Sequence, residues 1–176
     1  MIAHVNCTIF TIGFTKKTAE EFFRLLEDAG VQKVIDVREN RVGQLAGFAK
    51  YPDIAFFLDR MLHIQYIHEP LFAPSPEIRQ AYRKTKDWAA YEKSFHELME
   101  QRKILERADP AQFEGKVALL CSEAGPEKCH RRLLAERLAE HLRNQGHHVE
   151  VKHLVIDRPV AQRKRRSKKR DGTNLV

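Results

Sequence analysis

Short apolar runs alternate along this chain with longer segments in which apolar residues recur every three or four positions. The apolar runs resemble the inner strands of a parallel sheet. They occupy residues 7–14, 33–38, 64–68, 116–120 and 149–156. The segments predicted to be helical span residues 19–29, 54–62, 75–107 and 126–144. This alternation predicts an α/β fold: a layered, Rossmann-like sheet of mostly parallel strands with helices on both faces.

The turn between the fourth strand and the last helix carries the densest group of reactive side chains. Residues 121–131 contain two thiols, a carboxylate, an imidazole and a guanidinium, at Cys121, Cys129, Glu123, His130 and Arg131. In a parallel α/β sheet, ligands bind where the carboxyl end of a strand turns into a helix. The sequence therefore predicts a functional site at this turn.

The thiols have two interpretations if the helix begins at Pro126, a residue suited to the first helical position. Cys129 would then lie near the end of the first turn, where the helix dipole lowers the pKa of a thiol. In that position Cys129 is a candidate nucleophile, with His130 as its proton-transfer partner. The alternative is a buried structural thiol, and Cys121 is expected to serve packing at the end of its strand.

A metal centre is a third interpretation of the same residues. Cys121, Cys129 and His130 could supply three ligands, with Glu123 or His68 as a fourth. Their spacing matches no common zinc pattern, and the adjacent Cys129 and His130 would both have to turn toward one ion. The sequence therefore predicts no metal and no other cofactor.

Polar side chains also follow the first three strands, at Thr15, Arg38 and His68. Because parallel strands end at one edge of a sheet, these side chains are expected to surround one substrate pocket together with residues 121–131. Arg38 and Arg131, beside a helix N-terminus, are predicted to bind an anion such as phosphate. The alternative for each arginine is an ion pair with a neighbouring carboxylate.

The excess positive charge lies entirely in residues 158–176. This segment holds eight Lys or Arg and one Asp, which accounts for the net charge of +7 and leaves residues 1–157, the predicted single α/β domain, formally neutral. With little apolar content, the segment is predicted to be disordered in isolation and to bind the phosphates of DNA or RNA. A solubilising tail is the alternative. The residues expected to contact nucleic acid are Arg163, Lys164, Arg165, Arg166, Lys168, Lys169 and Arg170.

Several classes of protein are disfavoured by the sequence. The N-terminus lacks a basic region followed by a long apolar run, so no signal peptide is expected. No apolar stretch approaches the length of a membrane span, so no membrane partner is expected. Three cysteines are too few, and odd in number, for a secreted disulfide scaffold. The expected location is the cytoplasm.

Taken together, the motifs resemble a known family, catalogued as domain of unknown function 488, over residues 8–156. The Cys-x-Glu and Cys-His-Arg groups of residues 121–131 recur in that family at this spacing. Many members have Gly-His-Ser where this chain has Gly13-Phe14-Thr15, so a histidine role in that turn does not carry over. The resemblance implies an α/β fold and a site at these motifs, without an activity. The other matching motifs are Thr11-Ile12-Gly13, Asp36-Val37-Arg38, Gln44-Leu45-Ala46-Gly47-Phe48-Ala49-Lys50, Tyr66-Ile67-His68 and Leu71-Phe72-Ala73-Pro74.

The leading functional hypothesis is a protein that binds a nucleotide or nucleic acid and carries an anion pocket. Hydrolysis or base excision would fit, with Glu123 as the general acid and base. A small molecule that bears phosphate is a further candidate ligand. The first alternative is a sulfur- or phosphate-transfer enzyme with Cys129 as nucleophile. The second alternative is a nucleic-acid-binding module without catalytic activity.

Overall fold

The computed structural model describes residues 5–43 and 46–157 of the chain. Within these residues, five strands form one sheet in the order β3-β2-β4-β1-β5, and every neighbouring pair is parallel. The predicted layered α/β architecture is thus confirmed, with a sheet that is parallel throughout. The strands are β1 (Asn6–Gly13), β2 (Lys33–Asp36), β3 (Gln65–His68), β4 (Gly115–Cys121) and β5 (His148–Leu154).

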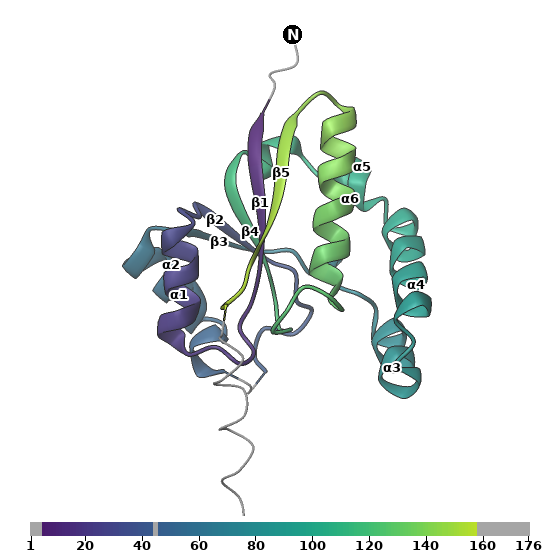
Figure 1. The fold of residues 1–176 in the computed structure, drawn as a ribbon, viewed down its shortest axis with the longest axis horizontal. Coiled ribbons are helices and arrows are strands. Elements are labelled where there is room, and N and C mark those ends of the chain that lie inside the picture. Colours follow the sequence, from purple (N-terminus) through teal and green to yellow (C-terminus); the bar gives the residue numbers. More distant parts are fainter. Residues whose placement is uncertain (1–4, 44–45, 158–176) are drawn as a thin grey trace, which may run out of the picture.

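Helices cover both faces of the sheet, as Figure 1 shows. The pair α1 and α2 lies on one side, and α4, α5 and α6 lie on the other, with α3 beside α4. Three short 3-10 helices complete the described structure: η1 (Gly47–Ala49), η2 (Pro70–Phe72) and η3 (Pro110–Phe113). The α-helices are α1 (Ala19–Asp28), α2 (Asp53–Leu62), α3 (Pro76–Thr85), α4 (Trp88–Gln101), α5 (Ile104–Arg107) and α6 (His130–Asn144).

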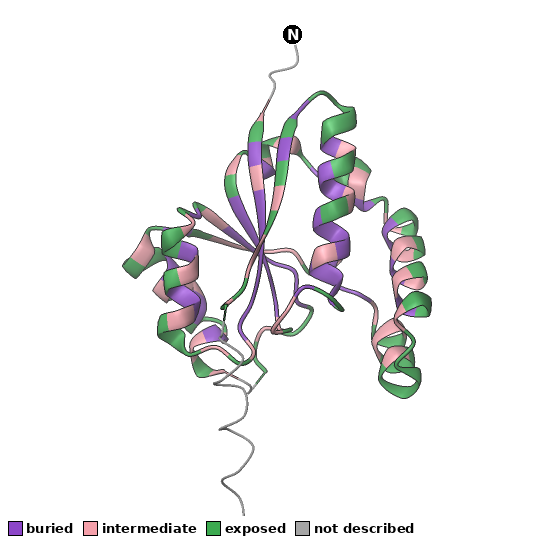
Figure 2. Cartoon of the chain, in the orientation of Figure 1, coloured by how far each residue is buried: buried purple, intermediate pink, exposed green. Residues whose placement is uncertain are grey.

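The buried core has two halves, one on each face of the sheet (Figure 2). Strand β4 shows the reason, because successive side chains of a strand point to opposite faces. Val117 and Leu119 pack with the residues of α4 and α6, whereas Ala118 and Leu120 pack with those of α1 and α2. A strand buried on both faces must be apolar along its whole length, and residues 117–120 of β4 are all apolar.

The turn between α3 and α4 sets the position of one wall of the site. Lys86 adopts a left-handed conformation, with φ 57°, and its N–H donates to the carbonyl of Tyr82, so α3 ends there. The Asp87 side chain then accepts a hydrogen bond of 3.0 Å from the N–H of Ala90 and caps α4. The turn therefore brings the last part of α3 against the first turn of α4.

The carboxyl ends of four strands form one row. Gly13 of β1 lies beside Cys121 of β4, and Asp36 of β2 lies beside both Leu120 of β4 and His68 of β3. This row is the sheet edge at which the sequence analysis expected the polar groups to converge. Strand β5 also ends at this edge, because its Leu154 pairs with Ile12 of β1.

Helix α6 begins later than the sequence suggested. Its first residue is His130, not Pro126, and Cys129 is the N-cap with an extended backbone, φ −141° and ψ 135°. The preceding residues form a loop instead of a helical turn. Two contacts fix that loop: Arg131 donates to the Glu123 carbonyl at 2.8 Å, and the Lys17 ammonium donates to the Ala124 carbonyl at 3.2 Å.

Two further expectations concern the chain ends and membranes. The basic segment 158–176 lies outside the described residues, as do Gln44 and Leu45 of the second-strand loop. Among the residues that are described, no helix combines the length and the apolar character that a membrane span requires.

Candidate functional site

A cavity of about 300 Å³ opens at the carboxyl edge of the sheet, between the start of α6 and helices α3 and α4. Its inner end is formed by Cys121, Cys129 and His130. The loop after β2 supplies one side through Arg38, and the loop after β4 supplies another through Glu123. The cavity therefore joins side chains that are far apart in the sequence, at the edge where parallel sheets bind ligands.

Cys121, Cys129 and His130 form a compact cluster at the inner end of the cavity. Their sulfur and nitrogen atoms all lie within 4.8 Å of one another. The Sγ atom of Cys121 lies 3.6 Å from Nδ1 of His130, and Nε2 of the same ring lies 3.3 Å from the carbonyl oxygen of Val37. Because a carbonyl only accepts, Nε2 carries the proton and Nδ1 presents its lone pair to the sulfurs. All three residues are buried.

The two thiols differ in acidity. The pKa of Cys121 lies well below its usual value because Cys129 donates a hydrogen bond to its sulfur, and the positive charge of Arg131 adds to the effect. Burial raises the pKa of Cys129, and the neighbouring Cys121 raises it further. The low pKa expected for Cys129 is therefore found at Cys121. The expectation depended on a first-turn position in the helix, whereas Cys129 precedes the helix.

Arg131 lies behind the cluster and does not line the cavity. It is fully buried, and its NH1 donates to the Glu123 carbonyl at 2.8 Å and to Cys129 Sγ at 3.2 Å. Its Nε and NH2 atoms have no hydrogen-bond partner among the described residues. The predicted phosphate-binding role of Arg131 therefore does not follow from this geometry. The guanidinium instead holds the loop and one thiol in place.

Arg38 lines the cavity, but its charge is already balanced. Its Nε and NH2 atoms donate to the two carboxylate oxygens of Asp36 at 2.8 and 2.6 Å, and NH2 also donates to the Ala49 carbonyl at 3.0 Å. Tyr66 donates to the same carboxylate at 2.7 Å. The ion pair with Asp36, which the sequence analysis kept as an alternative, is the arrangement found. Arg38 therefore shapes the cavity wall.

Thr15 and His68 lie near the cavity without lining it. The N–H of Thr15 donates to the Ser122 carbonyl at 3.1 Å, which ties the end of β1 to the loop after β4. Nε2 of His68 lies 2.8 Å from the carbonyl oxygen of Arg38. Of the residues predicted to surround one pocket, the structure thus brings Arg38, Glu123 and His130 together, with Thr15 and His68 outside the lining.

Three aromatic rings, which the sequence analysis did not include among the site residues, form one wall of the cavity. Tyr82 of α3 packs against Trp88 and Tyr91 of α4, with ring centroids 5.8 and 5.1 Å apart. Trp88 and Tyr91 are stacked, with centroids 4.9 Å apart and planes 21° apart. All three rings line the cavity. A signal existed in the sequence, since Trp88 and Tyr91 are three residues apart on one helical face.

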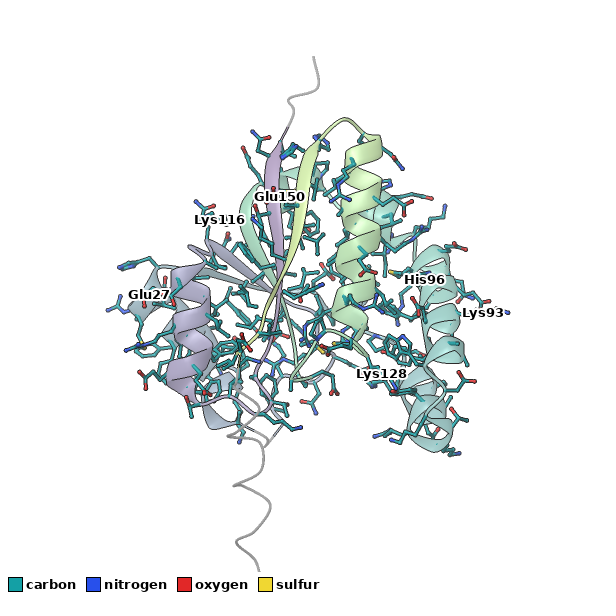
Figure 3. The ribbon with its side chains drawn as sticks, in the orientation of Figure 1. Glu27, Lys93, His96, Lys116, Lys128 and Glu150 are labelled. Atoms are coloured by element: carbon teal, nitrogen blue, oxygen red, sulfur yellow. The ribbon has the colours of Figure 1, made fainter. Side chains whose placement is uncertain are left out.

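Three more basic residues line the cavity: Arg79 and Arg83 of α3 and Lys128 of the loop before α6. Arg79 forms an ion pair with Glu39, which also lines the cavity. Within the described part of the chain, Arg83 and Lys128 have no ion pair. Figure 3 shows Lys128 in the space between the start of α6 and the α3–α4 pair. Because Arg38 is paired with Asp36 and Arg79 with Glu39, the charged lining residues without an ion pair in the described structure are Arg83, Lys128 and Glu123, a small positive excess that favours anions.

Comparison with known proteins supplies the class of this chain. A family model described as "Domain of unknown function DUF488" matches residues 18–138. The match covers more than half of the chain and includes β2, β3, β4 and the cavity-lining residues. The chain belongs to this family, which confirms the resemblance seen in its motifs. No curated protein and no solved structure matches it.

Proposed function

We propose that this protein is a hydrolase that binds a nucleotide, either free or within a nucleic acid, in the cavity at the carboxyl edge of the sheet. The observation that carries the proposal is the presence, in one cavity, of an aromatic wall and of two cations that have no ion pair among the described residues. Tyr82, Trp88 and Tyr91 form the wall, and Arg83 and Lys128 are the cations. A nucleotide has a flat π-system at one end and a phosphate at the other, so both parts have a partner.

The size of the cavity favours a single nucleotide. About 300 Å³ is at the lower end of the range of small-molecule sites. Trp88 is partly exposed and is stacked on Tyr91, so its ring offers a preformed face to a base. Stacking of one base on an aromatic side chain contributes roughly 1–3 kcal/mol and is tolerant of base identity.

The hydrolytic part of the proposal concerns Glu123. Its carbonyl is fixed by Arg131, while its exposed carboxylate has no ion pair among the described residues and lines the cavity. A carboxylate on a fixed backbone, at a cavity and without an ion pair in the described structure, is suited to accept a proton from water and return it to a leaving group. The cluster of Cys121, Cys129 and His130 lines the inner end of the same cavity.

The test uses the intrinsic fluorescence of the protein, because Trp88 is the only tryptophan of the chain. Nucleoside 5′-monophosphates are titrated into the full-length protein, with the nucleoside and ribose 5-phosphate titrated separately. The proposal predicts a saturable change in Trp88 emission with the monophosphates and weaker binding of either fragment. Loss of one charge-assisted contact costs about 1.5–3 kcal/mol, so Lys128→Ala should weaken monophosphate binding roughly ten- to hundredfold.

Lys93→Ala is the matched control. Lys93 lies on the outer side of α4 and is 80% exposed, and Figure 3 shows it directed away from Lys128. This variant should bind as the unaltered chain does. Equal affinity of the Lys128→Ala and Lys93→Ala proteins, or no response of Trp88 to any monophosphate, would contradict the proposal.

A further inference from the structure

We infer that Cys121, Cys129 and His130 form a binding site for a single zinc ion at the inner end of the cavity. Two thiolates and an imidazole are a common ligand set for zinc, which accepts four ligands in tetrahedral geometry. All three donor atoms lie within 4.8 Å of one another, so one ion reaches them together. This inference concerns metal binding itself and does not require that the cavity binds a nucleotide.

One separation between donor atoms already has the value that a zinc site requires, and the other separations are no longer than 4.8 Å. With Zn–S of about 2.3 Å and Zn–N of about 2.0–2.1 Å, tetrahedral geometry places sulfur and nitrogen ligands about 3.6 Å apart. Cys121 Sγ and His130 Nδ1 are 3.6 Å apart. The same geometry requires two sulfur ligands about 3.8 Å apart, within the spacing of the cluster.

The adjacent Cys129 and His130 converge because their backbones differ. Cys129 is extended as the N-cap, whereas His130 is the first residue of α6. Side chains of consecutive residues in one helix would diverge by about 100°, which follows from 3.6 residues per turn. The change from extended to helical backbone between the two residues removes that divergence. The structure thus meets the requirement that these adjacent residues turn toward one point, although their spacing in the sequence matches no common zinc pattern.

The surroundings of the ligands match those of known metal sites. His130 Nε2 donates to the Val37 carbonyl, so Nδ1 is the free donor and the ring is held in orientation. A histidine that binds a metal through one nitrogen almost always donates a hydrogen bond from the other. Arg131 donates to Cys129 Sγ at 3.2 Å and has no carboxylate partner among the described residues. The Arg131 guanidinium therefore places a positive charge beside a sulfur of the cluster.

The fourth coordination position would face the cavity. Cys121, Cys129 and His130 are all part of its lining, and three protein ligands with one open position are typical of catalytic zinc sites. If the proposed function holds, this position takes the water for hydrolysis. Its oxygen would form the new bond to the substrate, and the bond to the leaving group would break. The water proton would pass to Glu123, which also lines the cavity, and then to the leaving group.

The test is titration of the chelator-treated full-length protein with Co²⁺ in the presence of a non-thiol reductant. We expect about one ion per chain, a sulfur-to-cobalt charge-transfer band in the near ultraviolet, and intense visible bands of a tetrahedral site. Zinc should displace the cobalt and abolish these bands. A wild-type protein that binds no Co²⁺, or that binds it without the charge-transfer band, would overturn the inference.

Single substitutions assign the ligands. Cys121→Ser and Cys129→Ser should each lower the charge-transfer intensity and weaken Co²⁺ binding at least tenfold. Cys7→Ala is the control, because Cys7 lies at the start of β1 and its thiol is outside the cluster. If Cys7→Ala alone removed the band, the site would lie elsewhere. If circular dichroism shows that a serine variant does not fold, alkylation of the wild-type thiols replaces this test. Zinc should protect two of the three thiols from alkylation. Full reactivity of all three thiols with zinc present would overturn the inference.

Failure of this inference is distinguishable from failure of the proposed function. The cobalt titration needs no nucleotide, and the Trp88 fluorescence titration needs no metal. Cobalt binding with a thiolate band but no nucleotide response leaves the zinc site in place. A nucleotide response without cobalt binding removes the zinc site and leaves a cavity that binds nucleotide by its wall and cations.

Discussion

Gly13 and Glu123 lie in direct contact at the end of the sheet, where the backbone of β1 meets the carbonyl oxygen of the loop after β4. A Cβ atom at position 13 would overlap this oxygen, which also accepts the hydrogen bond from Arg131. Only glycine leaves room for the contact. The loop that carries Glu123 is therefore held in place by the absence of a side chain in β1.

Replacement of this glycine should destabilise the protein. In Gly13→Ala, the methyl group must displace the Glu123 carbonyl and disturb its bond with Arg131. Overpacking of this kind costs about 1–3 kcal/mol in the free energy of unfolding. Gly43→Ala is the control, because a Cβ there would meet no atom of the described residues within 4 Å, apart from its chain neighbours. Urea denaturation of both variants measures the difference, and an equal effect at the two positions would contradict the steric argument.

The ion pair between Asp36 and Arg38 should contribute strongly to stability. Asp36 is fully buried and Arg38 is 7% exposed, so removal of the carboxylate charge leaves a buried guanidinium without a counter-charge. We expect Asp36→Asn to lower the free energy of unfolding by about 3 kcal/mol. Glu20→Gln, which breaks the exposed pair with Arg24, should cost less than about 1 kcal/mol. Similar costs for the two variants, measured by urea denaturation, would show that burial does not set the energy of the Asp36–Arg38 pair.

Stability should fall in alkaline solution because of Cys7. Burial raises the pKa of this thiol from 9.0 to about 11, and Arg143 offsets the effect in part. Between these values the unfolded chain loses the thiol proton while the folded chain keeps it, so the free energy of unfolding decreases as pH rises from about 9 to 11. The loss should reach roughly 2 kcal/mol. Cys7→Ala lacks this component, and the difference between the two pH profiles isolates it; parallel profiles would contradict the prediction.

The basic segment 158–176 should provide most of the non-specific affinity for nucleic acid. It follows Asp157, three residues after β5, and β5 ends at the same sheet edge as the cavity. If about six of its cations meet phosphates, the logarithm of affinity should fall with the logarithm of salt concentration at a slope of roughly −4 to −5. A chain cut after Asp157 should give a much smaller slope on the same duplex. Equal slopes would place the nucleic-acid-binding surface, if one exists, on residues 1–157.

The architecture was readable from the sequence because each element has a local signature. The apolar run at 117–120 is typical of a strand that is buried on both faces. Thr18 and Glu21 form a capping box, which indicates the start of α1. The start of α6 was misplaced because a proline suited to a first helical turn is equally suited to a loop. The hydrogen bond from Arg131 to the Glu123 carbonyl favours the loop over the helical turn. This bond joins residues eight positions apart, so no local pattern around Pro126 reveals it.

The site could be predicted only in part, for a similar reason. The row of strand ends follows from parallel pairing, so the meeting of Arg38, Glu123 and His130 was predictable. The aromatic wall was not, because Tyr82 reaches Trp88 only through the left-handed turn at Lys86. Pairwise contacts also decide which charges are available: Asp36 neutralises Arg38, whereas Arg83 and Lys128 line the cavity without an ion pair in the described structure.

The most direct measurement is a crystal structure of the full-length protein grown with zinc and a nucleoside 5′-monophosphate, with anomalous data at the zinc edge. The predicted result is one anomalous peak about 2.3 Å from the sulfurs of Cys121 and Cys129 and about 2.0–2.1 Å from Nδ1 of His130. The base should lie against Trp88 and the phosphate near Lys128. A zinc peak away from these three residues, or a nucleotide bound outside this cavity, would contradict the proposed site.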